Sequence, residues 1–419
     1  THSRMSKILA RNARPHFTAE KRKKKTARKK NSVADERIAS ITFEPGRKFN
    51  GFVIAEKIGE GGFGRVYRCK NIEDGNEVVA LKAEAHVEAS GCAIKIERKV
   101  LNLIQSRAYA HHLPMCYNAA KRKNFSYMIM TLVGKSLKDV QKGMGKKNKG
   151  EYNNLHLSTW IRIGIQALYG LKTLHDNGFI HRDVKPANFA LGVDTDPEKA
   201  TIVHVLDFGL ARNYCYPIDD GEKRSNNEVP SGVPTRWRCR IARSKVNFRG
   251  TAKYCSPNAH DHVEQGRGDD IWSMMYMLVE FNSGLPWNGA KGLPAIKRKK
   301  CFYDDIDLMI NMPRELADIV PNLRKLDCYA RPDYQDIHRR FVEVMRRHDI
   351  GYEDRYDWEP KEKELIRPRL LPEWYDAEEF FTFDPIGDLD PGHAKKEDGD
   401  SKSTNNTTDE TRGGSKEVV

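Results

Sequence analysis

The sequence lacks several features that would assign it to common classes of protein. Its 419 residues contain no apolar run close to the roughly 18 residues that cross a bilayer, which predicts a protein without a membrane span. The eight cysteines form no CxxC pair, which argues against a zinc site and a disulfide framework and favours a reducing compartment. The first residues have no apolar core of a secretory signal, so we expect a protein of the cytoplasm, the nucleus or both.

The charge that is present has one dominant sign and an uneven distribution. The formal net charge is +14, and the stretch KRKKKTARKK at 21–30 contributes eight basic residues. We expect residues 1–45 to be a basic disordered tail and residues 386–419 to be a second, polar one. Three explanations of the basic run stay open: a solvated tail, a nuclear-import signal, or contact with an acidic surface such as RNA, lipid or tubulin.

Hydrophobic periodicity divides the remaining chain into a strand-rich part and a helical part. From about residue 50, short apolar runs broken by glycines predict β-strands. Apolar residues recur at helical spacing in 91–106, 158–178 and 269–284, and the last of these segments is apolar nearly all round. We therefore expect a small β-rich part followed by a larger helical part with a buried central helix.

The first motif with a chemical meaning is IGEGGFGRV at 58–66. Its three glycines, Gly59, Gly61 and Gly64, form the pattern GxGxxG, in which the backbone can approach phosphate oxygens closely. A dinucleotide site of the Rossmann type needs a helix directly after the glycines, but the following RVYRCK alternates like a strand. The motif therefore favours a strand–turn–strand flap over a nucleotide, with the dinucleotide site as the less favoured alternative.

A lysine and a glutamate further along the chain predict an ion pair beside this flap. Lys82 lies in the apolar run VVALK, and Glu97 has only apolar residues at the neighbouring helical positions. A buried carboxylate without a partner is costly, so Glu97 requires a cation from outside its helix, and Lys82 is the candidate. The alternatives are an outward-facing Lys82 and a rotated helix with Glu97 at its wet edge.

Two short stretches supply further polar groups. FIHRDVKPANF contains Asp183, Lys185 and Asn188, and VHVLDFGLA places Asp207 after an apolar run. Carboxylate and amide oxygens, together with phosphate oxygens, are suitable ligands for Mg²⁺. Each Asp or Asn taken singly is also typical of an ordinary turn, but the order and spacing of the set argue against that explanation.

Taken in order, these motifs resemble those of the eukaryotic protein kinases over residues 50–345. The resemblance implies an α+β, bilobal protein-kinase fold with a small β-rich N-lobe at 50–130, a hinge at 131–136 and a larger, mainly helical C-lobe at 137–345. We expect residues 346–385 to form a C-terminal extension that packs on the C-lobe through its aromatic side chains.

The resemblance also implies a role for each site residue. ATP would be enclosed by Gly59, Gly61, Gly64, Val66, Ala80, Met130 and Leu132, with its phosphates held by Lys82 and Lys82 held by Glu97. Mg²⁺ would be bound by Asn188 and Asp207. Asp183 would accept the proton of the substrate hydroxyl, and Lys185 would steady the phosphoryl group in transfer. The KPAN sequence resembles that of the serine/threonine kinases, so the implied substrates are Ser and Thr hydroxyls of proteins.

Other segments narrow the branch and show one departure. FRGTAKYCSPNAH and YDWE resemble the casein kinase I superfamily and, within it, the tau-tubulin kinases. In that pattern Thr251 braces the catalytic residues and Asp270 supports their loop. Most kinases have a glutamate where this chain has Asn258, and the partner of Arg331, which would bind that glutamate, is open.

The sequence leaves open the role of one basic segment and the choice among three classes of function. The long basic segment at 210–247 is either a surface insertion or a cradle for acidic or already phosphorylated protein substrates. The alternative to an active kinase is a pseudokinase scaffold, which the presence of Lys82, Asp183 and Asp207 argues against. A binder driven by the basic tail is a third class, and it is compatible with kinase activity.

Overall fold

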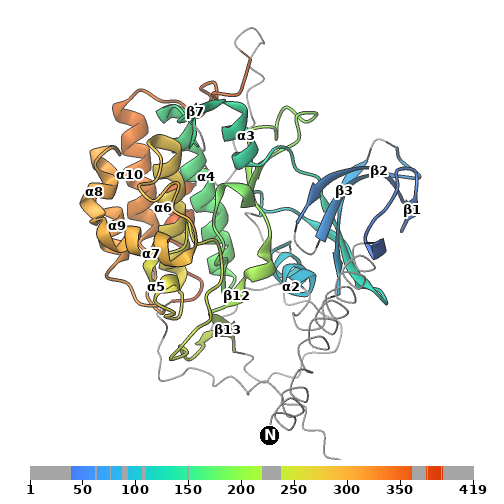
Figure 1. Cartoon of the computed structure of the whole chain (residues 1–419), viewed down its shortest axis with the longest axis horizontal. Coiled ribbons are helices and arrows are strands. Elements are labelled where there is room, and N and C mark those ends of the chain that lie inside the picture. The colour runs from blue at the N-terminus through green and yellow to red at the C-terminus, as the bar shows by residue number, and fades with distance from the viewer. Residues whose placement is uncertain are drawn as a thin grey trace, which may run out of the picture.

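The computed structural model describes residues 39–61, 64–75, 77–86, 93–105, 110–148, 151–218, 237–360, 374, 376–387 and 389. The expected tails therefore lie mostly outside the described residues, and so does the basic run at 21–30. Within the described ranges, no helix has the length and apolarity that crossing a membrane requires. The α+β fold with two lobes is confirmed: Figure 1 shows a curled sheet beside a larger bundle of helices.

The small lobe is one antiparallel sheet with a helix on one face. Its strands, in spatial order, are β1 (Lys48–Phe49), β2 (Phe52–Glu60), β3 (Gly64–Asn71), β4 (Val78–Ala85), β6 (Phe125–Thr131) and β5 (Cys116–Lys121). Alternation along β4 buries Leu81 and Ala83 in a core on one side of the sheet. Lys82 therefore points to the other side, where α2 (Ala93–Gln105) packs against β5 and β6.

The start of the small lobe corrects one prediction from the sequence. Residues 39–45 were expected to belong to the disordered tail, but Ile41 and Phe43 are each only 3% exposed. The Phe43 ring packs against Phe49 and Tyr67, and the Tyr67 hydroxyl donates a hydrogen bond to the carbonyl of Ile41. These two apolar residues are isolated among polar ones, so composition alone could not show that they complete the core.

The large lobe is built around two nearly completely buried helices, α4 (Leu157–Asp176) and α6 (Arg267–Asn282). Both correspond to the predicted helices at 158–178 and 269–284. The surrounding helices are α3 (Leu137–Gly143), α5 (Pro257–His260), α7 (Leu293–Phe302), α8 (Asp305–Met309), α9 (Ile319–Leu323), α10 (Tyr334–Arg347) and α12 (Ala377–Thr382). Short 3₁₀ turns are η1 (Pro186–Asn188), η2 (Phe208–Leu210) and η3 (Arg314–Leu316).

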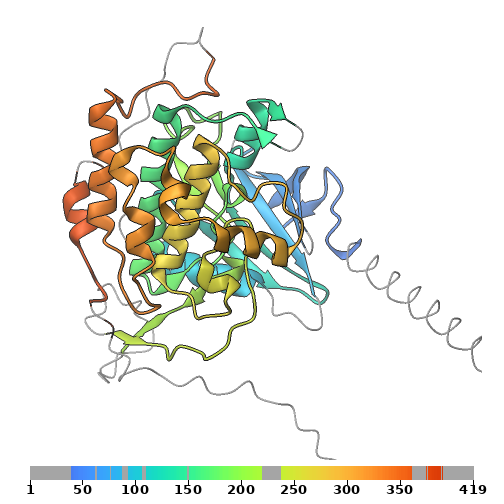
Figure 2. The same ribbon diagram turned by 60° about the vertical axis from the view of Figure 1, so that its left-hand side comes forward.

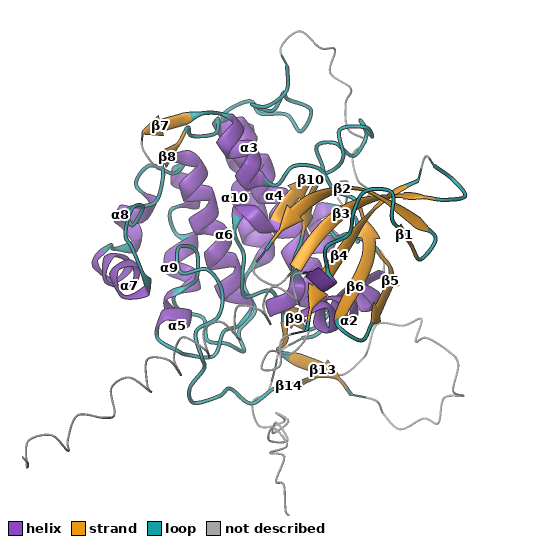
Figure 3. Cartoon of the chain, turned by 45° about the vertical axis from the view of Figure 1, so that its right-hand side comes forward, coloured by secondary structure: helices purple, strands orange, loops and turns teal. Residues whose placement is uncertain are grey.

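Pairs of short strands hold the loops that carry the polar motifs. β10 (Phe189–Leu191) pairs with β11 (Val203–Val205), and β9 (Phe179–Ile180) pairs with β12 (Arg212–Asn213). β13 (Cys215–Pro217) pairs with β14 (Trp237–Cys239), and β7 (Lys146–Asn148) pairs with β8 (Glu151–Tyr152). Figure 3 shows β9 and the β13–β14 hairpin close together below the junction of the lobes.

The described part of the C-terminal segment lies on the large lobe. α12 packs against α10, as Figure 2 shows for the red and orange helices at the edge of the molecule. Ile386 is only 8% exposed and, with Leu389, packs against other apolar residues. The prediction that the disordered tail begins at 386 is therefore wrong for these residues, because the sequence pattern did not reveal the apolar surface that receives them.

Candidate active site

The first half of the site is an ion pair between the sheet and α2. The ammonium nitrogen of Lys82 lies 2.9 Å and 2.8 Å from the two carboxylate oxygens of Glu97. Glu97 is only 2% exposed, so it occupies the packed face of α2 rather than the wet edge. Burial raises the pKa of Glu97 to about 7, while the Lys82 ammonium opposes the rise. Lys82 thus supplies the cation that the buried Glu97 carboxylate was expected to need.

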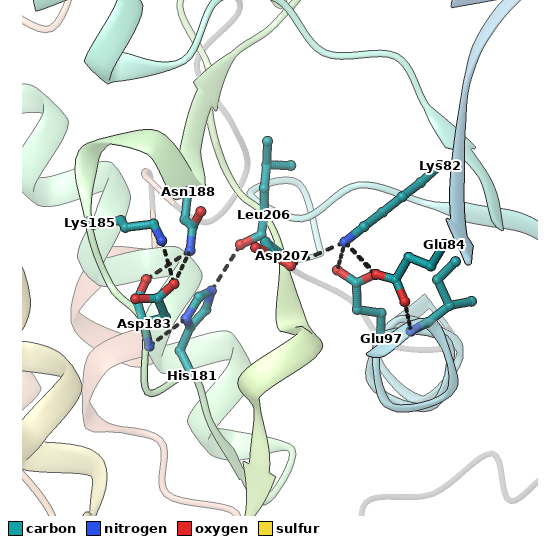
Figure 4. A network of polar contacts seen from close by, with 10 residues as sticks. Lys82, Glu84, Glu97, His181, Asp183, Lys185, Asn188, Leu206 and Asp207 are labelled. Atoms are coloured by element: carbon teal, nitrogen blue, oxygen red, sulfur yellow. Dashed lines mark hydrogen bonds and ion pairs between the residues drawn. The ribbon is translucent and has the colours of Figure 1, made fainter. Parts of the chain in front are cut away.

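Two more carboxylates face the same ammonium (Figure 4). Lys82 is 3.1 Å from Asp207 and 3.7 Å from Glu84. Burial alone would lower the pKa of Lys82, but the carboxylates of Glu97, Asp207 and Glu84 raise it above its ordinary value. Glu84 was not among the predicted residues, although its position two residues after Lys82 on the same strand places it on the same face. Its carboxylate also accepts the backbone N–H of Ile94 at the start of α2.

Asp207 links this ion pair to the large lobe. It adopts the left-handed conformation, with φ 64° and ψ 70°, immediately before η2. Burial would raise the pKa of Asp207, but Lys82 holds it at about 2, so the carboxylate is ionised at neutral pH. The preceding carbonyl, that of Leu206, lies 3.0 Å from the ring nitrogen Nε2 of His181. This contact joins the Asp207 loop to the loop that contains Asp183.

The second half of the site surrounds the Asp183 carboxylate, which is 8% exposed. The Lys185 ammonium lies 2.5 Å from one carboxylate oxygen, and the Thr251 hydroxyl donates to the other at 2.7 Å. Lys185 also donates to the Thr251 hydroxyl at 3.1 Å. The amide nitrogen of Asn188 donates to the backbone oxygen and to the carboxylate of Asp183, at 2.9 and 3.2 Å. The loop thus fixes one carboxylate with a cation beside it.

The backbone of this loop is held from beneath by Asp270 of α6. Its two carboxylate oxygens accept the backbone N–H groups of His181 and Arg182, at 2.6 and 2.8 Å. One oxygen also lies 2.9 Å from Nε2 of His175. Burial would raise the pKa of Asp270, but the hydrogen bond from His175 leads the contacts that lower it. Arg182 has a φ of 66°, so the carboxylate stabilises a conformation that non-glycine residues seldom adopt.

The predicted nucleotide-contacting residues share one face of the small-lobe sheet. The register places Val66 opposite Lys82 and Ala80 opposite Met130, and side chains directly opposite each other lie on the same face. Gly59 pairs with Val66 at the neighbouring position. The backbone N–H of Gly61 donates a hydrogen bond to the carbonyl of Gly64, at 2.8 Å, which closes the turn.

Leu132 follows β6 directly and is half-buried. It lies between the two lobes in the chain, as the hinge prediction requires. The tip of the glycine turn, residues 62 and 63, lies outside the described residues.

The donor set fits a hard divalent cation that is completed by phosphate oxygens. In the described ranges, no group of three or more His, Cys, Asp and Glu side chains forms a metal site by itself. Asp207 offers an ionised carboxylate, and Figure 4 shows the Asn188 amide oxygen turned away from Asp183. Two oxygen ligands of this kind suit Mg²⁺, which is usually held by one or two protein groups together with phosphates and water.

Comparison with known proteins gives consistent matches. The protein kinase domain family matches residues 52–341. A putative serine/threonine-protein kinase of Caenorhabditis elegans is 35% identical over 312 residues, which are 74% of this chain and 83% of the relative. An inactive tau-tubulin kinase of the same organism is 38% identical over 293 residues, covering 70% and 95%. A probable serine/threonine-protein kinase of Dictyostelium discoideum is 32% identical over 324 residues, covering 77% and 59%.

Proposed function

The chain belongs to the protein kinase family, in a branch similar to the tau-tubulin kinases, and from this premise we propose that it is an active serine/threonine kinase. In this proposal it transfers the γ-phosphoryl group of ATP, with Mg²⁺, to Ser or Thr hydroxyls of protein substrates. The segments FRGTAKYCSPNAH and YDWE support assignment to the casein kinase I-like group. The seven described cysteines are all free thiols, which supports our proposal of a cytoplasmic or nuclear location.

One observation carries the proposal. The two halves of the site are complete at the same time: Lys82 is paired with Glu97 at 2.8 Å, and Asp183 is paired with Lys185 at 2.5 Å. Phosphoryl transfer depends mostly on positioning and on neutralising charge, and both tasks need groups held in place before the reaction. A chain that served only as a scaffold would have no physical requirement for both pairs.

The residues divide the work according to their charge and position. ATP supplies the phosphoryl group when bound, and Mg²⁺ neutralises its oxygens. Lys82, fixed by Glu97, would bind phosphate oxygens, while Asn188 and Asp207 would hold the metal. The Asp183 carboxylate would orient the substrate hydroxyl and accept its proton as the hydroxyl oxygen bonds to the γ-phosphorus. The bond from that phosphorus to the β–γ bridging oxygen breaks at the same time, and ADP leaves. Lys185 would stabilise the negative charge of the phosphoryl group in transfer, and the Thr251 hydroxyl holds the side chains of Asp183 and Lys185 in position.

The second candidate is a pseudokinase scaffold. It is favoured by one specific finding, which is that a relative 38% identical to this chain is named inactive. The name describes that relative alone. The presence of Lys82, Asp183 and Asp207 in contact with their partners favours activity in this chain.

The test is transfer of labelled phosphate from ATP and Mg²⁺ to dephosphorylated casein and to the chain itself. We expect Asp183→Asn to lower the rate by at least about 100-fold, the usual contribution of a general base. Binding of a fluorescent ATP analogue should change little, because Asp183 lies on the substrate side. Asp318→Asn is the matched control, since that side chain is 71% exposed. A folded wild-type chain that binds ATP but transfers no phosphate to dephosphorylated casein, to pre-phosphorylated casein or to itself would support the pseudokinase scaffold.

We also propose that acidic or already phosphorylated segments are the preferred substrates. A small cavity beside the catalytic loop is lined by Arg212, Arg240, Glu264 and Tyr329, among others. Burial, together with the positive charges of Arg212 and Arg243, lowers the pKa of the nearby Arg182 to about 10. Glu264 lies 2.7 Å from Arg243 and 3.5 Å from Arg212, so it offsets part of this charge. The cluster therefore favours an additional anion.

Arg240→Gln tests this preference. The variant should raise the KM for pre-phosphorylated casein about tenfold, the effect of losing one charge-assisted hydrogen bond. The KM for dephosphorylated casein should change much less. Arg346→Gln is the control, because its side chain is 74% exposed and pairs with Glu343 on the surface of α10. Equal losses on both substrates would show that Arg240 does not distinguish phosphorylated substrate.

A further inference from the structure

The described C-terminal residues form a structure that the motifs of the site do not explain. We call residues 376–387 and 389 the C-terminal clasp. Its helix α12 is anchored on α10 and α4 by Phe381, which is fully buried. The Phe381 ring lies 4.4 Å from the ring of His338 and 4.6 Å from that of Tyr169. Aromatic contacts of this kind fix the helix to the large lobe.

Two cations of the large lobe bind the end of α12 and the residues directly after it. The Lys172 side chain is fully buried, and its ammonium donates to the carbonyl of Phe383 at 2.9 Å and to Asp176 at 2.5 Å. Arg331 donates to the carbonyl of Phe381 at 3.1 Å and pairs with Asp384 at 3.3 Å. Buried or half-buried cations need acceptors, and the clasp supplies them. The clasp is therefore part of the folded lobe.

The other end of the clasp reaches the hairpin β13–β14. The indole N–H of Trp237 donates to the carbonyl of Pro385 at 2.8 Å. Ile386 and Leu389 pack in one apolar cluster with Tyr214, Cys215, Trp237 and Ile180. Trp237 is the first residue of β14, and Ile180 lies three residues before Asp183. The same cluster thus touches β13 and β14, which lie within the basic segment 210–247 (the activation segment of the kinase pattern), and β9, the strand that leads into the catalytic loop.

The clasp also answers the question of the Arg331 partner. Asn258 stands where the kinase pattern has a glutamate, and its amide donates to Asp269 of α6 at 3.0 Å. Arg331 is instead bound by Asp384 and by two carbonyls of the clasp, those of Phe381 and Phe383. The ion pair that would hold the activation segment in the pattern is thus replaced by contacts to the C-terminal segment.

We propose that the C-terminal clasp is a positioning element for phosphoryl transfer: it holds the β13–β14 hairpin, and through it β9 and the catalytic loop, in the geometry the reaction needs. This inference rests on the proposed function. The residues that carry it are Trp237, which joins the clasp to β14, and Asp384, which joins the clasp to Arg331 of the large lobe. Neither is among the predicted ATP-binding or catalytic residues. The clasp therefore stabilises the active arrangement of the catalytic loop, and it does not act as an autoinhibitory contact.

The experiment uses the full chain and three variants: Trp237→Phe, Asp384→Asn and the two combined. Phe keeps an aromatic ring but removes the indole donor to Pro385, and Asn keeps the volume of Asp384 but removes its charge. Asp318→Asn, at an exposed position of the same lobe, is the control. Hydrogen–deuterium exchange of 212–218 and 237–246 is measured beside kcat and KM for ATP.

Each lost contact should speed exchange in those two segments about fivefold, the effect of one hydrogen bond, and leave exchange of α4 and α6 unchanged. The double variant should lower kcat at least tenfold, with KM for ATP within about twofold of wild type. A purely structural role would instead speed exchange throughout the lobe and lower the melting temperature without this separation of kcat from KM.

Unchanged exchange in both segments would overturn the proposal, and so would faster exchange with unchanged or increased kcat. The exchange measurement needs no activity, so it separates the two proposals. An inactive wild type would refute the proposed function and, with it, the catalytic role of the clasp. In that case the exchange pattern still decides whether the clasp holds the hairpin.

Discussion

Replacing Lys82 by Met gives the strongest test of the electrostatics of the site. The change removes the cation that faces Glu97 at 2.8 Å, Asp207 at 3.1 Å and Glu84 at 3.7 Å. Breaking a buried ion pair costs about 3 to 5 kcal/mol of unfolding free energy. We expect a loss of about 3 kcal/mol at pH 7, the lower end of that range, because Glu97 can become neutral by binding a proton.

The loss should depend on pH with a defined sign. Burial already raises the pKa of Glu97 to about 7 beside Lys82, and removing Lys82 raises it further. A folded-state pKa above the unfolded value of about 4.3 gives stability that is present at low pH and lost as the pH rises through the folded pKa. Above pH 7 the variant still binds a proton that wild type has released. The difference in unfolding free energy between them should therefore grow by about 1.4 kcal/mol per pH unit.

Urea unfolding at pH 6, 7 and 8 measures this difference. Lys82→Met combined with Glu97→Gln is the matched control, because Gln cannot titrate and the additional pH dependence should disappear. A loss that does not grow between pH 7 and pH 8 would refute the reasoning, as would an equal fall in the stability of the double variant over that interval. Either result would mean that Glu97 is not the buried group that Lys82 keeps ionised.

Two further predictions concern the loop that holds Asp183. Thr251→Ala removes the hydroxyl that donates to Asp183 at 2.7 Å and accepts from Lys185. Steady-state kinetics should show a kcat about tenfold lower and an unchanged KM for ATP, and Thr251→Ser should restore kcat. Loss of ATP binding in Thr251→Ala would contradict this role. Asp270→Asn replaces an oxygen that accepts a backbone N–H with an amide donor, and thermal unfolding should show a loss of about 2 to 3 kcal/mol. Because the pKa of Asp270 is lowered, its stabilisation is present above the unfolded pKa of about 3.9 and lost as the pH falls below it, so the loss in the variant should shrink in acid.

The sequence was most informative where the chemistry restricts neighbouring residues strongly. Glu97 has apolar neighbours on its helix, so its carboxylate needed a cation from another element, and the structure places Lys82 there. The same strand alternation that orients Lys82 also orients Glu84, so Glu84 could have been predicted from its spacing alone. It was missed because the expected motif requires one carboxylate, whereas the ammonium faces three.

The sequence was least informative where single apolar residues complete a surface built by distant segments. Ile41, Phe43 and Ile386 lie in polar stretches, and nothing in their local pattern shows which core receives them. Each packs against residues that are close only in the fold, such as Tyr67 for Phe43 and Cys215 for Ile386. Composition describes a segment by its average, so it assigns such residues to tails.

The contacts of the C-terminal clasp show a deeper reason for the same difficulty. Lys172 and Arg331 bind the clasp largely through the carbonyls of Phe381 and Phe383, and every amino acid has a carbonyl. A backbone acceptor leaves no mark in the sequence, so neither contact to the clasp could be predicted before the fold was known. Among the polar contacts that hold the clasp, only those made by the side chains of Trp237 and Asp384 are specific to residue type. Substitutions of these two residues can therefore break the clasp selectively, whereas changes at 381–383 should preserve the backbone bonds and alter only the packing of α12.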